Sequence, residues 1–214
     1  YVLFSGKINN TTENEIRVFS NRNDFNKIIP VTKDGTFSDT LDIEQKGPYR
    51  FIIGKERSNI FLEQGDQLHL SIDPKQFDES IVYTGTAAPV NNYLAEKILV
   101  EESFIKDGPR GYEELFSKDA DSFKIEIHKQ EQIKNELLKK YENLNTAFIA
   151  SQKKENHYGY LSLLNDYEST HRYFTKNQDY EVPQGYLDEL KTLNIDIAED
   201  FETSDAYKNL SSAI

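Results

Sequence analysis

The chain of 214 residues contains no Cys, no Met and no Trp. The lack of Cys excludes disulfides, thiol catalysis and thiolate metal sites. No apolar run approaches the roughly 20 residues that a membrane-spanning helix needs, and no signal peptide is visible. We therefore predict a folded body that does not insert into a membrane. The chain begins with Tyr1 and not with Met, which leaves room for a leader or a lipid anchor before it.

Basic residues are scarce relative to acidic ones. The net charge is -12. Residues 1–90 hold 10 Lys and Arg against 13 Asp and Glu, which leaves 15 against 24 for residues 91–214. Because a negative surface repels phosphate backbones and anionic lipids, we expect neither nucleic acid nor a membrane surface as a partner of the folded body.

Aromatic residues, by contrast, are plentiful. The chain has 13 Tyr and 13 Phe, and 37% of its residues are hydrophobic. Aromatic side chains each bury a large area, and a chain of this length can form a substantial core. The composition predicts a globular protein and not a disordered one.

Apolar and polar residues alternate from Tyr1 to about Gly85. This period of two predicts about seven short strands, separated by Gly, Asn, Asp and Pro at intervals of about 8 to 12 residues. The alternation is clearest at Leu3/Ser5, Ile16/Val18, Phe37–Ile43, Tyr49–Ile53, Ile60/Leu62 and Leu68–Ile72. Such spacing is typical of a sandwich or a barrel, and we predict an antiparallel β-sandwich domain over residues 1–85.

Two turns that contain Gly give the strongest pattern in this region. Asp34-Gly35 and Gly65-Asp66 each lie between two apolar runs. Gly accepts the positive φ that a tight turn requires. We therefore expect each turn to join a pair of strands as a hairpin, one within residues 31–43 and the other within residues 60–72.

After Gly85 the apolar period becomes helical. We expect helices over about 87–105, from Asp119 or Asp121 to about Lys154, and over Asn156–Thr175, Tyr186–Leu193 and Glu199–Leu210. Residues 106–111 predict a linker turn and no phosphate loop, because the Lys and Ser or Thr of such a loop are missing. The predicted fold class is thus α+β with segregated domains, in which an all-α domain spans residues 86–214.

The sequence shows no recognisable catalytic or metal-binding pattern. The four His residues have no ligand spacing such as H-E-x-x-H, and we expect no metal and no cofactor. They are His69, His128, His157 and His171. The acidic pairs Glu101-Glu102 and Glu113-Glu114 suit a helix surface better than the acid and base of glycoside cleavage. A hydrolase is the least supported function, since no G-x-S-x-G motif is present either.

One aromatic group is a candidate for binding. The residues Tyr158, Tyr160, Tyr167, Tyr173 and Phe174 gather within one predicted helix. Aromatic residues at helical spacing most often form a core. Exposed ones could instead bind a peptide or a sugar in a groove between the sandwich and the helices. We name these five as possible partner-binding residues.

Five motifs follow one another in an order that resembles a known arrangement. They are Phe4-Ser-Gly6-Lys-Ile8, Asp34-Gly35-Thr-Phe37, Gly47-Pro-Tyr49-Arg-Phe51, Ile60-Phe-Leu62-Glu-Gln-Gly65-Asp66, and Thr84-Gly85 followed by Asn91-Asn92-Tyr93-Leu94. Over about residues 3–95 the sequence resembles the N-terminal region of bacterial envelope thiol-disulfide oxidoreductases of the TlpA/ResA-like type. In that family a β-sandwich and a helical segment precede a thioredoxin-like domain.

The resemblance implies an accessory role without catalysis. The thioredoxin-like domain of the family carries Cys-x-x-Cys, whereas this chain has no Cys, so no catalytic residue is carried over to it. The implied location is the periplasm or the outer-membrane side of the cell envelope. The implied partners are a thioredoxin-like domain beyond this chain, a protein substrate, or a second copy in a homodimer. The alternative is a free-standing peptide- or carbohydrate-binding module of the cell envelope.

Overall fold

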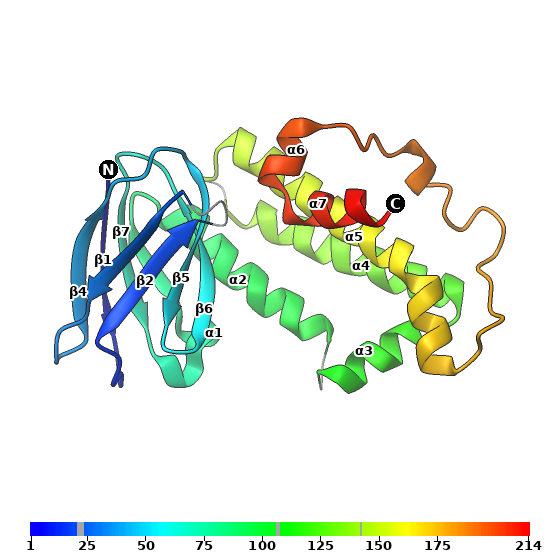
Figure 1. Cartoon of the computed structure of the whole chain (residues 1–214), viewed down its shortest axis with the longest axis horizontal. Helices are drawn as coiled ribbons and strands as arrows, with labels where there is room; N and C mark the ends of the chain where they lie inside the picture. The colour runs from blue at the N-terminus through cyan, green and yellow to red at the C-terminus, as the bar shows by residue number, and fades with distance from the viewer. Residues whose placement is uncertain (21–23, 106–107, 142) are drawn as a thin grey trace. The chain divides into compact units, whose positions relative to one another are not determined.

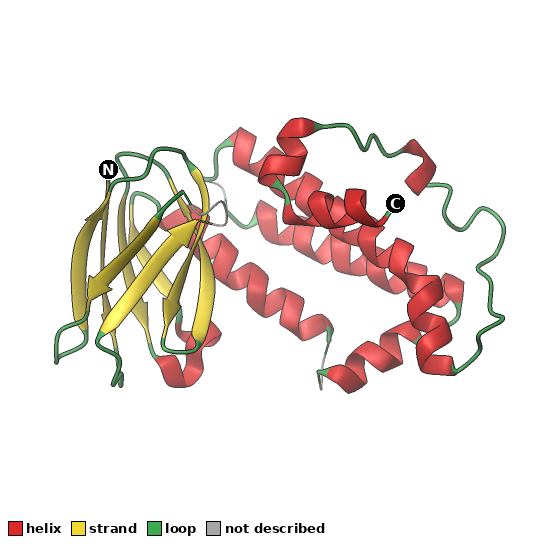
Figure 2. Ribbon diagram, viewed as in Figure 1, coloured by secondary structure: helices red, strands yellow, loops and turns green. Residues whose placement is uncertain are grey.

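The computed structural model describes residues 1–20, 24–105, 108–141 and 143–214. Strands occupy the first part of the chain and helices the second (Figure 2), which confirms the predicted α+β class with segregated elements. The chain divides into two compact units, Tyr1–Leu99 and Val100–Ile214. Gly85, where we expected the domain boundary, is the last residue of the last strand. The first unit also includes most of the helix that follows this strand.

Within the described residues, the first unit contains eight strands in two sheets. They are β1 (Val2–Ile8), β2 (Glu15–Ser20), β3 (Asn26–Pro30), β4 (Thr36–Leu41), β5 (Gly47–Ile53), β6 (Glu56–Leu62), β7 (Gln67–Ile72) and β8 (Val82–Gly85). One sheet has the order β4-β1-β7-β8 and the other the order β3-β2-β5-β6 (Figure 1). The sequence predicted about seven antiparallel strands. The pairing of β1 with β7 is parallel, whereas β1 with β4 and β7 with β8 are antiparallel.

The alternation of side chains explains the core of this sandwich. Each long strand buries every second residue, as β5 does with Tyr49, Phe51 and Ile53. Phe4 of β1 and Phe37 of β4 meet edge to face with ring centroids 5.1 Å apart. The inward side chains of both sheets thus form one hydrophobic core, as aligned sheet packing requires.

The two Gly turns do not close hairpins, so that prediction was wrong. β3 pairs with β2 and β4 pairs with β1, and Asp34-Gly35 therefore carries the chain from one sheet to the other. Gly65-Asp66 does the same between β6 and β7, which also belong to different sheets. Gly35 and Gly65 have φ of 84° and 92°. The need for Gly was thus predicted correctly, but the partners of the flanking strands were not.

The helices are mostly in the second unit. They are the 3-10 helix η1 (Pro74–Gln76), α1 (Phe77–Ser80), α2 (Ala88–Phe104), α3 (Pro109–Phe116), α4 (Ala120–Lys139), α5 (Thr146–Thr175), the 3-10 helix η2 (Leu190–Thr192), α6 (Ala198–Thr203) and α7 (Asp205–Ala213). Within the described residues no helix is both long and apolar enough to cross a membrane.

Two adjacent Asn side chains attach α2 to one edge strand of each sheet. The Asn91 amide accepts from the Phe61 backbone N–H at 2.8 Å and donates to the Phe61 carbonyl at 2.9 Å. The Asn92 amide pairs in the same way with Tyr83, at 2.8 and 2.9 Å. Phe61 lies on β6 and Tyr83 on β8, which are edge strands with backbone groups that lack a strand partner on one side. We call this arrangement the Asn91–Asn92 clamp.

Several helix boundaries differ from the prediction. Part of the expected linker turn belongs to α3. Gly108 takes a φ of 58° immediately before this helix. Pro109 then begins the helix, where its missing N–H costs nothing because the first N–H groups of a helix have no partner within it. Residues 106 and 107 of that predicted turn lie outside the described residues. Asp119 caps α4 as expected, since its carboxylate accepts from the Ser122 N–H at 3.0 Å.

The helix predicted to reach Lys154 is in fact two helices. α4 ends at Lys139, and Asn145 begins α5 by accepting from the Phe148 N–H at 2.7 Å. Asn145 is a favourable N-cap residue, but an apolar stripe that continues across it hides the break. The predicted helix at 186–193 is reduced to turns and η2, and the last one is divided at Ser204 into α6 and α7.

Candidate functional site

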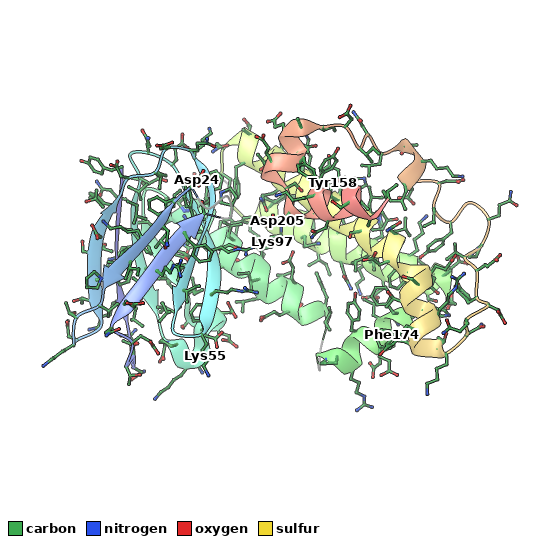
Figure 3. The ribbon with its side chains drawn as sticks, viewed as in Figure 1. Asp24, Lys55, Lys97, Tyr158, Phe174 and Asp205 are labelled. Atoms are coloured by element: carbon green, nitrogen blue, oxygen red, sulfur yellow. The ribbon has the colours of Figure 1, made fainter. Side chains whose placement is uncertain are left out.

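The five aromatic candidates do not form one surface. Tyr158, Tyr160 and Tyr167 are buried in the core of the second unit. Tyr173 is 73% exposed, and Phe174 is only partly buried. Figure 3 shows Tyr158 and Phe174 far apart along α5. In this conformation the three buried rings serve packing, and Tyr173 alone presents a largely open ring.

The buried Tyr hydroxyls hold neighbouring segments in place. The Tyr167 hydroxyl donates to the Lys118 carbonyl at 2.7 Å, and the Tyr158 hydroxyl donates to Asp200. Burial raises the pKa of Tyr158 and of Tyr167 above the ordinary value. Both hydroxyls therefore stay protonated and act as donors.

Tyr160 belongs to a charged cluster that the sequence did not predict. Lys124, His128 and Glu131 lie at spacings of four and three residues on α4, so they share one face of the helix. The facing residues of α5 are His157 and Tyr160, and Glu189 joins them from the turn before η2. We call these six residues the α4–α5 polar cluster.

Glu131 is the centre of one half of this cluster. Its Oε1 lies 3.0 Å from His157 Nδ1, and its Oε2 lies 3.5 Å from His128 Nδ1. The Glu131 side chain is only 11% exposed, whereas both imidazoles are about half exposed. His128 also lies 3.1 Å from the Gln132 amide through its Nε2. One shielded carboxylate thus faces two accessible imidazoles.

Glu189 is the centre of the other half. Lys124 Nζ lies 2.6 Å from its Oε1, and the Tyr160 hydroxyl donates to its Oε2 at 3.0 Å. The Tyr160 ring connects the two halves. It stacks on His157 at 6.0 Å between centroids and meets His128 edge to face at 5.7 Å.

The protonation states follow from these contacts. The hydrogen bond with Glu131 raises the pKa of His157 above its ordinary value, and burial opposes this effect only in part. Burial raises the pKa of Glu189, but hydrogen bonds from Lys124 and Tyr160 outweigh burial and leave that pKa lowered. Burial, together with the bond to Glu189, raises the pKa of Tyr160. The Glu131 carboxylate therefore favours the protonated form of His157.

The cluster can bind and release protons, but its residues do not form a nucleophilic site. A nucleophilic mechanism needs a Ser, Cys, Thr or Lys held against a base. Lys124, the nearest such group, is already paired with Glu189. Across the part of the chain that the structure describes, no group of three or more His, Cys, Asp or Glu side chains is arranged to hold a metal ion. The geometry thus supports electrostatic stabilisation of the α4–α5 pair.

The other residues considered from the sequence lie apart from this cluster. Glu101 approaches Lys134 at 4.0 Å, and Glu114 pairs with Arg110 at 3.6 Å on α3. His69 is exposed on β7, whereas His171 is buried and lies 2.8 Å from the Phe116 carbonyl through its Nδ1. None of these contacts, among the described residues, brings two carboxylates together across a cleft.

A shallow groove runs along a different face of α4. Its volume is about 360 Å³, and its lining includes the apolar side chains Val100, Ile133 and Leu137 together with Lys129 and Lys140. The groove is open to solvent. Gln132 and Glu136 complete its lining, so the groove offers an apolar floor with a mixed polar rim.

The sequence held part of the signal for the polar cluster. The four-residue and three-residue spacings of Lys124, His128 and Glu131 are visible in the sequence, and so is the three-residue spacing of His157 and Tyr160. These spacings match no metal-ligand motif, and for this reason the sequence did not predict the cluster. Glu189 is far away in sequence and could be placed only from the fold.

Comparison with known proteins gave no match: no family model, no curated protein and no solved structure matches the chain. The relationship to TlpA/ResA-like oxidoreductases is therefore a proposal that rests on residues and their positions.

Proposed function

We propose that this chain is the non-catalytic N-terminal accessory region of a bacterial envelope thiol-disulfide oxidoreductase. In this role the sandwich and the helices position a thioredoxin-like domain, bind its protein substrate or mediate self-association. The proposed location is the periplasm or the outer-membrane side of the envelope.

The observation that carries the proposal is the Asn91–Asn92 clamp. The motif Asn91-Asn92-Tyr93-Leu94 was part of the resemblance, and both amides hold edge strands of the sandwich. Tyr93 is completely buried beside them. A helix fixed to both sheets at its start is a firm point of attachment for the segment that follows it. The residues that carry the resemblance thus fix α2 to the sandwich, as we expect of a region that positions another domain.

The chemistry of the chain also supports this role. It has no Cys, and the α4–α5 polar cluster pairs its acids with bases internally. The buried aromatic side chains serve packing. These features favour positioning and binding over a reaction carried out by this chain.

Reduction of insulin by dithiothreitol, followed by turbidity, tests the proposal. The isolated 214 residues should give no acceleration over dithiothreitol alone. The protein produced from the complete reading frame should accelerate the reaction, and changing its Cys-x-x-Cys to Ser-x-x-Ser should abolish the effect. A complete protein without reductase or oxidase activity would argue against the proposal.

The groove on α4 favours a second function, a peptide-binding module. Val100, Ile133 and Leu137 offer an apolar floor, and Lys129, Lys140 and Glu136 supply charged groups, two basic and one acidic, at its rim. Titration calorimetry with acidic amphipathic peptides would test this function. Saturable binding that Ile133→Asp abolishes would support it, and the absence of heat with every peptide would count against it.

A further inference from the structure

The outer face of the β3-β2-β5-β6 sheet has a charge opposite to that of the whole chain. Outward positions carry Arg17, Arg50 and Arg57, and the acidic residue at such a position is Glu15. The chain as a whole has a net charge of -12. Sheet formation does not require basic residues at these outward positions, so the positive charge of this face suits a binding role.

The strand register arranges this face as alternating apolar and basic side chains. Ile28 of β3 pairs with Arg17 of β2, Arg17 with Ile52 of β5, and Ile52 with Arg57 of β6. Because neighbouring strands lie about 4.8 Å apart, Arg17 and Arg57 are separated by about 10 Å across the sheet. Ile28 is 54% exposed. The row therefore presents two cations with exposed apolar surface beside them.

Among the described residues, neither Arg17 nor Arg57 has an acidic partner. Arg17 donates through Nε to Asn26 at 2.8 Å, and its guanidinium lies 5.8 Å from the centre of the Phe19 ring. Arg57 is exposed on β6. The Asn contact fixes the direction of Arg17 and still leaves its positive charge without a carboxylate.

The complementary surface lies in the C-terminal part of the same sequence. Residues 177–207 contain nine Asp and Glu and one Lys, so this segment has a net charge of -8, compared with -12 for the whole chain. Within it Asp196, Glu199 and Glu202 are exposed. The exposed apolar side chains Ile195 and Phe201, at 53% and 46%, lie among them. Acidic and apolar groups thus alternate here, as basic and apolar groups do on the sheet.

We infer that the outer face of the β3-β2-β5-β6 sheet binds residues 194–203 of a second copy of this chain. Opposite charges set the approach and the register, and the exposed apolar groups Ile28 and Phe201 are buried in the contact. Because each copy has both surfaces, a two-fold dimer forms the contact twice and leaves neither surface open. The dimer specifies the self-association named in the proposed function and rests on that part of it; a chain that stays monomeric would leave the positioning and substrate-binding roles untouched.

Sedimentation velocity of the 214-residue protein tests this inference. At low ionic strength and chain concentrations up to about 0.1 mM, we expect twice the monomer mass. At about 0.5 M NaCl, where the screening length falls to about 4 Å, the dissociation constant should rise at least about tenfold. A monomer under all conditions would overturn the inference.

Charge reversal identifies the two surfaces. Arg17→Glu with Arg57→Glu should weaken the dimer at least about tenfold, and so should Glu199→Lys with Glu202→Lys. Mixing the two variants should restore a heterodimer, because each contact again joins opposite charges. The matched control, Lys33→Glu with Lys75→Glu, makes the same change in net charge away from the face and should leave the dimer intact.

Two results would give the outer face of the β3-β2-β5-β6 sheet a different role or none. A dimer that neither charge-reversed variant weakens would show that other surfaces associate. A monomer that binds phosphatidylglycerol vesicles, and loses this binding on Arg17→Glu with Arg57→Glu, would assign the face to a membrane. Either result overturns the inference. Circular dichroism checks that the variants, which change exposed side chains, keep the wild-type fold.

Discussion

Asn91 and Asn92 show how two neighbouring residues can serve two different sheets. Successive residues of a helix point about 100° apart, so the two amides reach different edge strands. Asn91 is fully buried and makes three hydrogen bonds, including one to the Ala87 carbonyl at 2.9 Å. Its removal would leave the Phe61 backbone groups without these partners.

Asn91→Ala should therefore lower the free energy of unfolding by about 2 to 3 kcal/mol, since buried polar groups left unpaired are costly. Urea denaturation measures the change, and hydrogen exchange should show faster exchange at the Phe61 amide. Asn209→Ala, an exposed position on α7, provides the control and should change stability by less than about 0.5 kcal/mol. An equal effect of both variants would show that the Asn91 hydrogen bonds do not stabilise the fold.

The protonation of His157 makes the free energy of unfolding depend on pH. Its pKa is raised in the folded state, so the protonated form favours folding. This contribution is fully present below the unfolded pKa of about 6.5 and is lost as the pH rises through the higher folded value. Because the imidazole is half exposed, the contribution is at most about 1 kcal/mol.

Urea denaturation between pH 5 and 8.5, about two units on each side of an ordinary His pKa, should detect this loss in the wild type. His157→Gln should remove that part of the pH dependence, and Glu131→Gln should also bring the NMR titration midpoint of His157 back toward its ordinary value. His69→Gln, on the other unit, is the control. An unchanged pH profile in His157→Gln would refute the role of the Glu131 contact.

At the scale of elements, α5 organises the second unit. Its Leu161, Leu164 and Tyr167 are buried in the core, while Lys154 and Tyr158 hold α6 through Asp200. Lys154 Nζ lies 2.8 Å from Asp200 Oδ1. Burial raises the pKa of Asp200, but the hydrogen bonds from Lys154 and Tyr158 outweigh burial and leave that pKa lowered. The short helix α6 thus depends on one buried carboxylate.

Asp200→Asn should release α6 before the rest of the unit unfolds, because it removes a buried charge-assisted contact worth about 1 to 3 kcal/mol. Hydrogen exchange of residues 198–213 should accelerate, and limited proteolysis should cut near this segment. Asp179→Asn, an exposed acid outside residues 198–213, should do neither. Full protection in Asp200→Asn would mean that the remaining contacts hold α6 and α7, among them buried Tyr207 and Leu210 and the Glu155 carboxylate at Ser204 and Ala206.

The elements also show what local sequence can predict. Gly35 and Gly65 were recognised as turns because positive φ is a local requirement. Their strand partners were not, because pairing depends on which sheet accepts the next strand. The break at Asn145 was missed for a similar reason, since the apolar stripe continues into α5. The Asn91–Asn92 motif was visible in the sequence, but its two backbone partners are nine and thirty residues away.

At the scale of the whole molecule, a sandwich of two four-stranded sheets and a helical unit occur in one chain without Cys. The class of fold was predictable from periodicity, because the change from a period of two to a helical period falls near Gly85. The polar cluster was not, because it needs Glu189 brought onto α4 and α5. The function we propose unites these observations. In it, this chain positions a thioredoxin-like domain and binds its partners, and thiol-disulfide exchange is carried out by that domain.

The reading frame downstream of the Ile214 codon tests that claim most directly. We predict that it continues into a thioredoxin-like domain with Cys-x-x-Cys at a helix N-terminus, where the helix dipole lowers the pKa of the first thiol. A stop codon directly after Ile214, or a following domain without that dithiol, would contradict the proposed accessory role.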